Sequence, residues 1–148
     1  EFRGLNLSEN DLKIMGSLHH VIIDMERIGD HAENIAEFTF TLSEKRGCLS
    51  QEAETELRTM AKRTIEMLSA ALEIFESRNE SRLDGIEKME QEIDRMKKQF
   101  INNHIERLQV KTCDPQVGVI FTNMISVLER VADHAHNIAL SLLGEDMY

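Results

Sequence analysis

The feature that most constrains this chain is a polar segment that occurs twice. Residues 24–36 read Asp-Met-Glu-Arg-Ile-Gly-Asp-His-Ala-Glu-Asn-Ile-Ala, and residues 127–139 read Val-Leu-Glu-Arg-Val-Ala-Asp-His-Ala-His-Asn-Ile-Ala. Aligned without gaps, the two copies keep Glu, Arg, Asp, His, Ala, Asn, Ile and Ala in register. Packing alone constrains the apolar positions and leaves polar ones free to vary. A polar pattern kept in two copies therefore indicates a site.

Both copies have the spacing of an amphipathic helix. In the first copy the apolar side chains expected on one face are Ile22, Met25, Ile28, Ala32, Ile35 and Ala36. Glu26 and Asp30 are four residues apart, so they stack on one side of that helix, and Glu129 and Asp133 do the same in the second copy. Each pair lies roughly 120–180° from the middle of the apolar face. We expect these carboxylates on the polar side of the helix or its margin.

Composition favours an all-α protein of one domain or part of one. The chain has 148 residues, a single Pro, no Trp and a net charge of −10. Such a charge argues against nucleic acid and anionic membranes as direct partners, and no apolar run is long enough to span a membrane. The first residue is not Met, and we interpret the chain as an expressed fragment. Cys48 and Cys113 match no CxxC pattern and are expected to be free thiols.

Turn and capping signals divide the chain into four long helices. They are expected at about 8–45, 50–78, 81–109 and 114–143. The predicted starts are a capping box of Ser8 with Asp11, Ser50, a second box of Ser81 with Asp84, and Asp114 followed by Pro115; the predicted stops include Gly47 and Asn79. For residues 50–78 the expected apolar stripe is Leu57, Met60, Ala61, Ile65, Leu68, Leu72 and Phe75. Short connections imply an antiparallel bundle.

The spacing of the two motifs predicts a three-helix repeat. Each motif ends one unit, so residues 50–143 form a complete unit, and residues 8–45 form the last helix of a preceding unit. The apolar face of that first helix should then pack on the other three helices or on a second copy of the chain, because an exposed stripe of that size invites association. We expect a homo-oligomer formed through this helix.

Carboxylates from two helices predict a metal site. Glu90 and Asp94 repeat the Glu-x-x-x-Asp spacing, and placed opposite Glu129 and Asp133 they would bring four like charges together. Such a group repels itself unless protons or a cation neutralise it, and hard cations and iron prefer carboxylate oxygens. Asn137, one turn beyond Asp133, is a further candidate ligand. The competing interpretation is an acidic, solvated helix face that binds nothing.

No catalytic pattern is present. A ferritin-like di-iron oxidase is the enzyme alternative, but such sites use Glu-x-x-His pairs facing the bundle interior, and no Glu here is followed by His three residues later. His31 and His134 lie beside the apolar stripe and are expected to be hydrogen-bonded packing residues. His104, on a core face, is also expected to be structural.

The two motifs, together with Ile-Glu-Lys-Met-Glu-Gln-Glu-Ile-Asp-Arg-Met at 86–96, resemble the PhoU family. The resemblance covers nearly the whole chain and implies a non-catalytic regulator of phosphate uptake built from two three-helix repeats. It also implies surface clusters of iron or zinc. Carried over by position, Glu90, Asp94, Glu129 and Asp133 would hold one cluster, with Asn137 as a possible addition. Glu26 and Asp30 would supply half of a second cluster, whose other ligands would belong to the absent helices.

The wording Asp-His-Ala-x-Asn-Ile and the segment Cys-Asp-Pro-Gln-Val-Gly-Val-Ile-Phe at 113–121 resemble one subgroup of the family, the PhoU-like tails of bacterial sodium/phosphate cotransporters. That resemblance implies a cytoplasmic domain tethered to the membrane through its transporter. A free-standing PhoU accessory protein is the alternative. The implied partner is a membrane transporter or a phosphate-sensing histidine kinase, and no residue selects between them.

Overall fold

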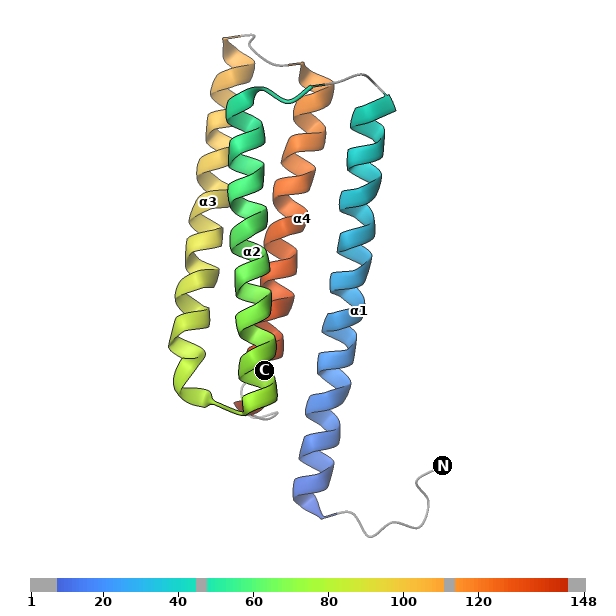
Figure 1. Ribbon diagram of the computed structural model, residues 1–148, viewed down its shortest axis with the longest axis vertical. Helices are drawn as coiled ribbons and strands as arrows, with labels where there is room; N and C mark the ends of the chain where they lie inside the picture. Colours follow the sequence, from blue (N-terminus) through green and yellow to red (C-terminus); the bar gives the residue numbers. More distant parts are fainter. Residues whose placement is uncertain (1–7, 45–47, 111–113, 144–148) are drawn as a thin grey trace.

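Four long helices make up the chain, as predicted. The computed structural model describes residues 8–44, 48–110 and 114–143. Within them the helices are α1 (Glu9–Glu44), α2 (Gln51–Ser77), α3 (Leu83–Gln109) and α4 (Pro115–Leu140), with 3-10 turns η1 (Glu80–Arg82) and η2 (Ser141–Leu143). Successive helices run in opposite directions (Figure 1). The all-α antiparallel bundle is confirmed. None of the described helices is long and apolar enough to cross a membrane.

Three of the predicted helix starts are confirmed by their hydrogen bonds. Ser8 and Asp11 form the reciprocal capping box, with Ser8 N donating to Asp11 Oδ2 at 2.9 Å and Asp11 N donating to Ser8 Oγ at 3.2 Å. Ser50 Oγ accepts from Ala53 N at 3.2 Å. Asp114 Oδ1 accepts from Gln116 N at 2.7 Å, ahead of Pro115 at the first helical position. Gly47 and Cys113 lie outside the described residues.

The predicted junction between α2 and α3 was wrong in two details. The left-handed residue that ends α2 is Arg78, with φ of 54°, and not Asn79. Asn79 instead starts the 3-10 turn, because its side-chain oxygen accepts from the backbone N of Ser81 at 3.2 Å. Ser81 is therefore inside that turn, and α3 begins at Leu83 without a side-chain cap.

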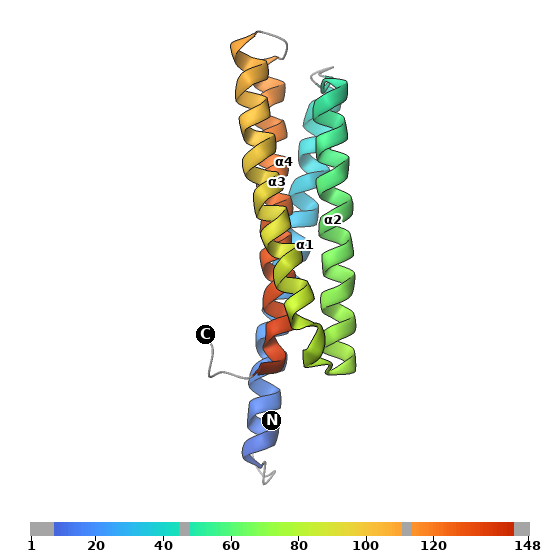
Figure 2. The same ribbon diagram turned by 90° about the vertical axis from the view of Figure 1, so that its left-hand side faces the viewer.

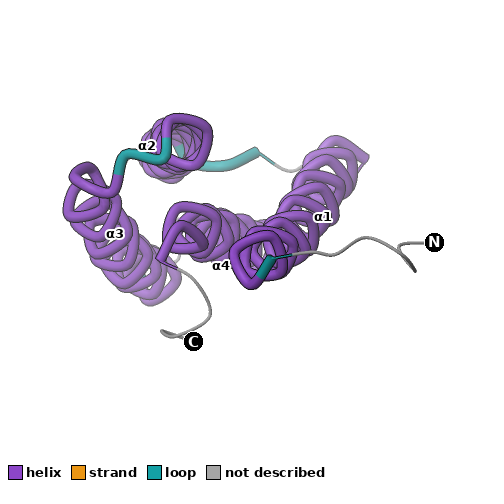
Figure 3. Tube along the Cα trace, turned by 90° about the horizontal axis from the view of Figure 1, so that it is seen from below, coloured by secondary structure: helices purple, strands orange, loops and turns teal. Residues whose placement is uncertain are grey.

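Helix α4 is the central element of the bundle. Seen end-on, it lies between α1 on one side and the α2–α3 pair on the other (Figure 3), and it contacts all three. Thirteen of its residues are buried. Helix α1 packs on α4, and its N-terminal end extends beyond the other helices (Figure 2). The two copies of the motif thus lie side by side in antiparallel orientation.

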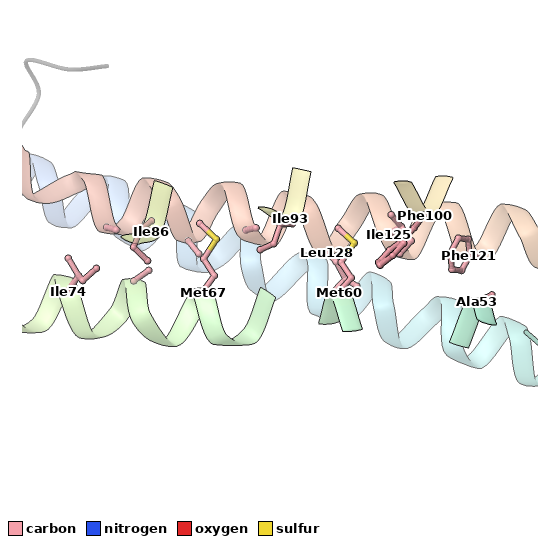
Figure 4. Close-up of a cluster of buried hydrophobic side chains, with 14 residues drawn as sticks. Ala53, Met60, Met67, Ile74, Ile86, Ile93, Phe100, Phe121, Ile125 and Leu128 are labelled. Atoms are coloured by element: carbon pink, nitrogen blue, oxygen red, sulfur yellow. The ribbon is translucent and has the colours of Figure 1, made fainter. Parts of the chain in front are cut away.

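The core is formed by α2, α3 and α4 (Figure 4). On α2 it includes Met60, Met67 and Ile74, which are 0–1% exposed and follow each other at seven-residue intervals. The predicted stripe of α2 was rotated relative to this line, because Ile65 is 63% exposed and Leu72 is 39% exposed. The buried face instead takes in Thr64 and Ala71, whose side chains are small enough to let α2 approach α4 closely.

Candidate functional site: the acidic face of α3 and α4

The two predicted carboxylate pairs of α3 and α4 do lie on the same face of the bundle. Glu90, Asp94 and Glu129 are half-buried, whereas Asp133 is exposed. The pKa of the Asp133 carboxyl is raised by partial desolvation against the neighbouring helix and then by the negative charges of Glu129, Asp94 and Glu90. These four side chains are therefore close enough to repel one another. None lies in the core, as predicted.

A lysine that sequence reasoning missed lies within this acidic face. Lys97 Nζ is 2.7 Å from Glu129 Oε2, and the two side chains are only 29% and 17% exposed. The same ammonium lowers the pKa of Asp133, in opposition to the three carboxylates. Lys97 follows Asp94 by three residues, so it lies on the same margin of α3. The positive charge of Lys97 neutralises part of the negative charge at Glu129. A metal ion was predicted to have this role.

The donor chemistry suits a hard cation, but the side chains are not gathered around one point. Across residues 8–44, 48–110 and 114–143, no three His, Cys, Asp or Glu side chains lie close enough to hold a metal ion. Any cation at this face would have to draw the carboxylates inward and compete with Lys97 for Glu129. The carboxylates are therefore of the chemical type that binds metal ions, but they are not arranged around a metal position. Glu129 is instead paired with the ammonium of Lys97.

The remaining candidate ligands lie elsewhere. Glu26 and Asp30 are exposed on α1, where Arg27 reaches Asp30 at 3.9 Å. Asn137 Nδ2 lies 3.4 Å from Asp24 Oδ1, at the interface between α1 and α4. Glu26 and Asp30 are therefore on a different helix from the four carboxylates of α3 and α4, whereas Asn137 is on α4 and also contacts α1.

The two motif histidines face each other across the α1–α4 interface. The rings of His31 and His134, which occupy equivalent positions, have centroids 5.4 Å apart. His134 Nδ1 is 2.8 Å from Asp24 Oδ1, which confirms it as a hydrogen-bonded packing residue. His31 differs, because its Nδ1 is buried with no hydrogen-bond partner among the described residues. The counterpart of Asp24 in the second copy is Val127, so the equivalent acceptor is missing.

His104 is buried at the end of the bundle where α2 and α4 begin. It is 5% exposed, and its ring lies 5.5 Å from that of Phe121. Gly118 leaves room for it, since a Cβ at that position would overlap the imidazole. Burial, assisted by the charge of Arg107, lowers the pKa of His104. The ring borders a small cavity of about 150 Å³ lined also by Cys48, Ser50 and Asp114. The structural role predicted for His104 is confirmed.

The fold and the acidic face define an all-helical domain with a duplicated Glu-x-x-x-Asp motif. Comparison with known proteins identifies the family to which this domain belongs. The model of the PhoU domain matches residues 2–39 and 57–142. The chain is 30% identical over 115 residues to phosphate-specific transport system accessory protein PhoU homolog 1 of Thermotoga maritima, covering 78% of this chain and 49% of that protein. The chain belongs to the PhoU family.

Two further relatives are PhoU homologues of the phosphate-specific transport system. One, from Burkholderia sp, is 27% identical over 129 residues, covering 87% of this chain and 55% of that protein. The other, from Pseudomonas aeruginosa, is 28% identical over 133 residues, covering 88% of this chain and 53% of that protein. The chain thus spans about half the length of these relatives. No solved structure gave a significant match.

Proposed function

We propose that this chain is a non-catalytic regulatory domain in phosphate uptake. The observation that carries the proposal is its membership of the PhoU family, supported by relatives named as accessory proteins of phosphate-specific transport. We further propose that the domain acts on the cytoplasmic side of the membrane as the tail of a sodium/phosphate cotransporter. In that arrangement α1 closes a preceding three-helix unit, and the transporter is the partner. A free-standing accessory protein of the same family is the second candidate.

The cellular test is the regulation of uptake. The gene segment encoding this chain is deleted in its host, and phosphate uptake is measured in phosphate-rich and phosphate-poor medium. The proposal expects uptake that no longer responds to phosphate, with the response restored when the segment is returned. Uptake that is regulated normally without the segment contradicts it. The gene context distinguishes the two candidates. A reading frame that also encodes several membrane spans supports the transporter tail, and a frame without them supports the free-standing protein.

We also propose that the acidic face of α3 and α4 binds iron or zinc in competition with Lys97. The support is the mutual repulsion of Glu90, Asp94, Glu129 and Asp133, which a divalent cation relieves more fully than one ammonium. The cation would supply charge that holds α3 and α4 together at this face. The four carboxylates would be its ligands.

Metal titration followed by elemental analysis tests this second proposal. Wild-type protein is expected to bind the metal, and Glu129→Gln with Asp133→Asn to lose it. Lys97→Gln is expected to bind more tightly, because the competing ammonium is gone. The matched control is Glu26→Gln with Asp30→Asn, the equivalent pair on α1, which leaves binding at the α3–α4 face intact. Absence of saturable binding in both the wild type and Lys97→Gln contradicts the proposal.

A further inference from the structure

Among the described residues, His104 is the one ionisable residue that is buried, at 5% exposure. The two other buried polar residues are Thr64 and Ser141, and each donates a hydrogen bond to a backbone carbonyl oxygen. The His104 ring makes no hydrogen bond to a described group and packs instead against the backbone of Gly118 and the ring of Phe121. A buried imidazole without a hydrogen-bond partner is stable in such a place only while it is uncharged.

Two charged groups face His104 from α3 and α2. Arg107 of α3 pairs with Glu56 of α2 at 2.8 Å, and the guanidinium of Arg107 lies 5.2 Å from the ring centroid of Phe121. Burial and then the positive charge of Arg107 lower the pKa of His104, and the negative charge of Glu56 raises it by less. An imidazolium in this position would be a second cation beside the same aromatic ring.

A cavity of about 150 Å³ lies beside the His104 ring, and a carboxylate borders it. The cavity lining includes Asp114 and Ser50, which cap α4 and α2, and also Cys48. Asp114 accepts from the backbone N of Gln116 and of Val117 on Oδ1, so Oδ2 is not used in the cap. A cavity of about 150 Å³ holds a benzene molecule, and an imidazole ring is smaller. The cavity thus offers a displaced ring both space and a counter-charge.

We propose that His104 is a pH-sensitive latch at this end of the bundle. At neutral pH the uncharged ring packs on Gly118 and Phe121. When the ring takes up a proton from solvent, the imidazolium moves away from Arg107 into the cavity and pairs with the carboxylate of Asp114. The latch belongs to the three-helix unit of α2, α3 and α4, and it is independent of the proposed role in phosphate uptake.

The end of the bundle that the latch controls also holds the entry to α2. Residues 48–50 lead into α2 beside the cavity (Figure 1), and Ala53 and Phe121 of the core lie at the same end (Figure 4). When the ring leaves, Phe121 loses a packing neighbour, and Asp114 is drawn toward the imidazolium. The starts of α2 and α4 then open at a lower free energy. Acid thus loosens this end of the bundle while the far end stays closed.

The sign of the pH dependence follows from the burial of His104. The folded chain binds a proton at this ring less readily than the unfolded chain. The stability that the neutral ring contributes is therefore complete above the ordinary histidine pKa of about 6.5 and is lost as the pH falls below it.

Hydrogen exchange of the 148-residue chain, read by mass spectrometry between pH 7.5 and pH 5, tests the proposal. Peptides covering residues 50–56 and 114–121 are expected to exchange at least about tenfold faster at the lower pH, after correction for the intrinsic rate of amide exchange. Residues 67–74, toward the other end of α2, should show no such change. A wild type whose corrected exchange at residues 50–56 and 114–121 is the same at both pH values overturns the proposal.

His104→Gln shows whether this ring is the cause. Glutamine has a side chain of similar size that takes up no proton in this pH range, so the corrected exchange at residues 50–56 and 114–121 is expected to be equal at both pH values. In the wild type, the chemical shifts of the His104 ring in a nuclear magnetic resonance titration should change with the same midpoint as the exchange. An acceleration in His104→Gln as large as in the wild type contradicts the latch.

Asp114→Asn tests the partner of the imidazolium. Asparagine caps a helix about as well as aspartate, so the start of α4 is kept while the counter-charge is lost. The midpoint of the exchange change is expected to move to lower pH. Asp84→Asn, which removes a carboxylate from the first turn of α3 at the opposite end of the unit, is the matched control and should leave the midpoint in place. An unchanged midpoint in Asp114→Asn overturns the proposal even if His104→Gln fails to fold.

Discussion

At the scale of single residues, Gly118 of α4 lies directly against the side chain of His104 of α3. The imidazole lies directly on the backbone of α4, so only a hydrogen fits at the glycine position. A methyl group there must displace His104, whose residue is only 5% exposed, from its position beside Phe121. The glycine is therefore fixed by packing rather than by backbone conformation.

We predict that Gly118→Ala lowers the free energy of unfolding by about 1–3 kcal/mol, the usual cost of overpacking. In a His104→Ala background the same change is expected to be neutral or stabilising, because alanine is the better helix former. Urea denaturation of the wild type, Gly118→Ala, His104→Ala and the double variant measures the coupling free energy between the two positions. Gly85→Ala is the control, since nothing lies within 4 Å of its added Cβ; an equal cost at both glycines would show that the contact with His104 is not the cause.

A second residue-scale prediction concerns Asp133. Its pKa is higher in the folded chain than in the unfolded chain, so the unfolded state loses this proton first as the pH rises. Stability then falls through the interval above the ordinary aspartate pKa of about 3.8 and levels off above the folded pKa. The substitution Asp133→Asn removes the titrating carboxyl, and with it this loss of stability at higher pH.

We therefore expect Asp133→Asn to gain stability over the metal-free wild type as the pH is raised from acid to neutral. Thermal unfolding at a series of pH values in chelator measures the difference. Glu106→Gln, an exposed residue of α3 away from the acidic face, serves as the control and should show no comparable trend. A gap between Asp133→Asn and the wild type that is constant with pH would mean that the repulsion at this face is negligible.

At the scale of helices, α2 and α3 are joined by one largely buried ion pair and one partly exposed ion pair. Arg107 Nη2 lies 2.8 Å from Glu56 Oε2, with the side chains only 13% and 12% exposed, and Asn103 donates to the same carboxylate at 2.7 Å. Nearer the middle, Arg63 of α2 pairs with Glu92 of α3, with both side chains about one-third exposed or more. Burial makes the first pair costly to break, because the remaining charge would lose its partner without regaining water.

We predict that Glu56→Ala costs about 2–3 kcal/mol, between the values for exposed and fully buried pairs. Glu54→Ala, which breaks an exposed pair with Arg58 within α2, should cost less than about 1 kcal/mol. Both variants are compared with the wild type by urea denaturation. Equal costs would show that the α2–α3 pair contributes no more than an ordinary surface pair.

At the scale of the whole molecule, stability should be distributed unevenly. Helix α4 is buried by three neighbours, whereas α1 packs on α4 along one edge and extends past the bundle at its N-terminal end (Figure 2). Segments with little buried apolar contact open at low free energy.

We predict that amides of the first three turns of α1 exchange fastest among the four helices and that those of α4 exchange slowest. Native-state hydrogen exchange read by mass spectrometry measures the order. Exchange in α1 as slow as in α4 would contradict the unequal distribution.

The sequence alone determined the helices and the acidic face, because both depend on local spacing. Capping residues such as Ser50 and Asp114 act within one turn, and a Glu-x-x-x-Asp pair is on one side of its helix whatever surrounds it. The meeting of the α3 pair with the α4 pair was a hypothesis at that level, because it depends on how the two helices pack. Lys97 could have been found by the same spacing from Asp94.

Only the tertiary structure decided which apolar side chains are covered and what balances the charges. The apolar arc of α1 is broader than one neighbour can cover, so periodicity could not show that Val21 is buried while Ile22 is exposed. The stripe of α2 was misjudged because small residues such as Ala71 let a helix approach more closely than large exposed ones. The pairing of Lys97 with Glu129, and of His134 with Asp24, joins residues far apart in the chain. Such contacts depend on how helices are placed in space, and local sequence does not contain that information.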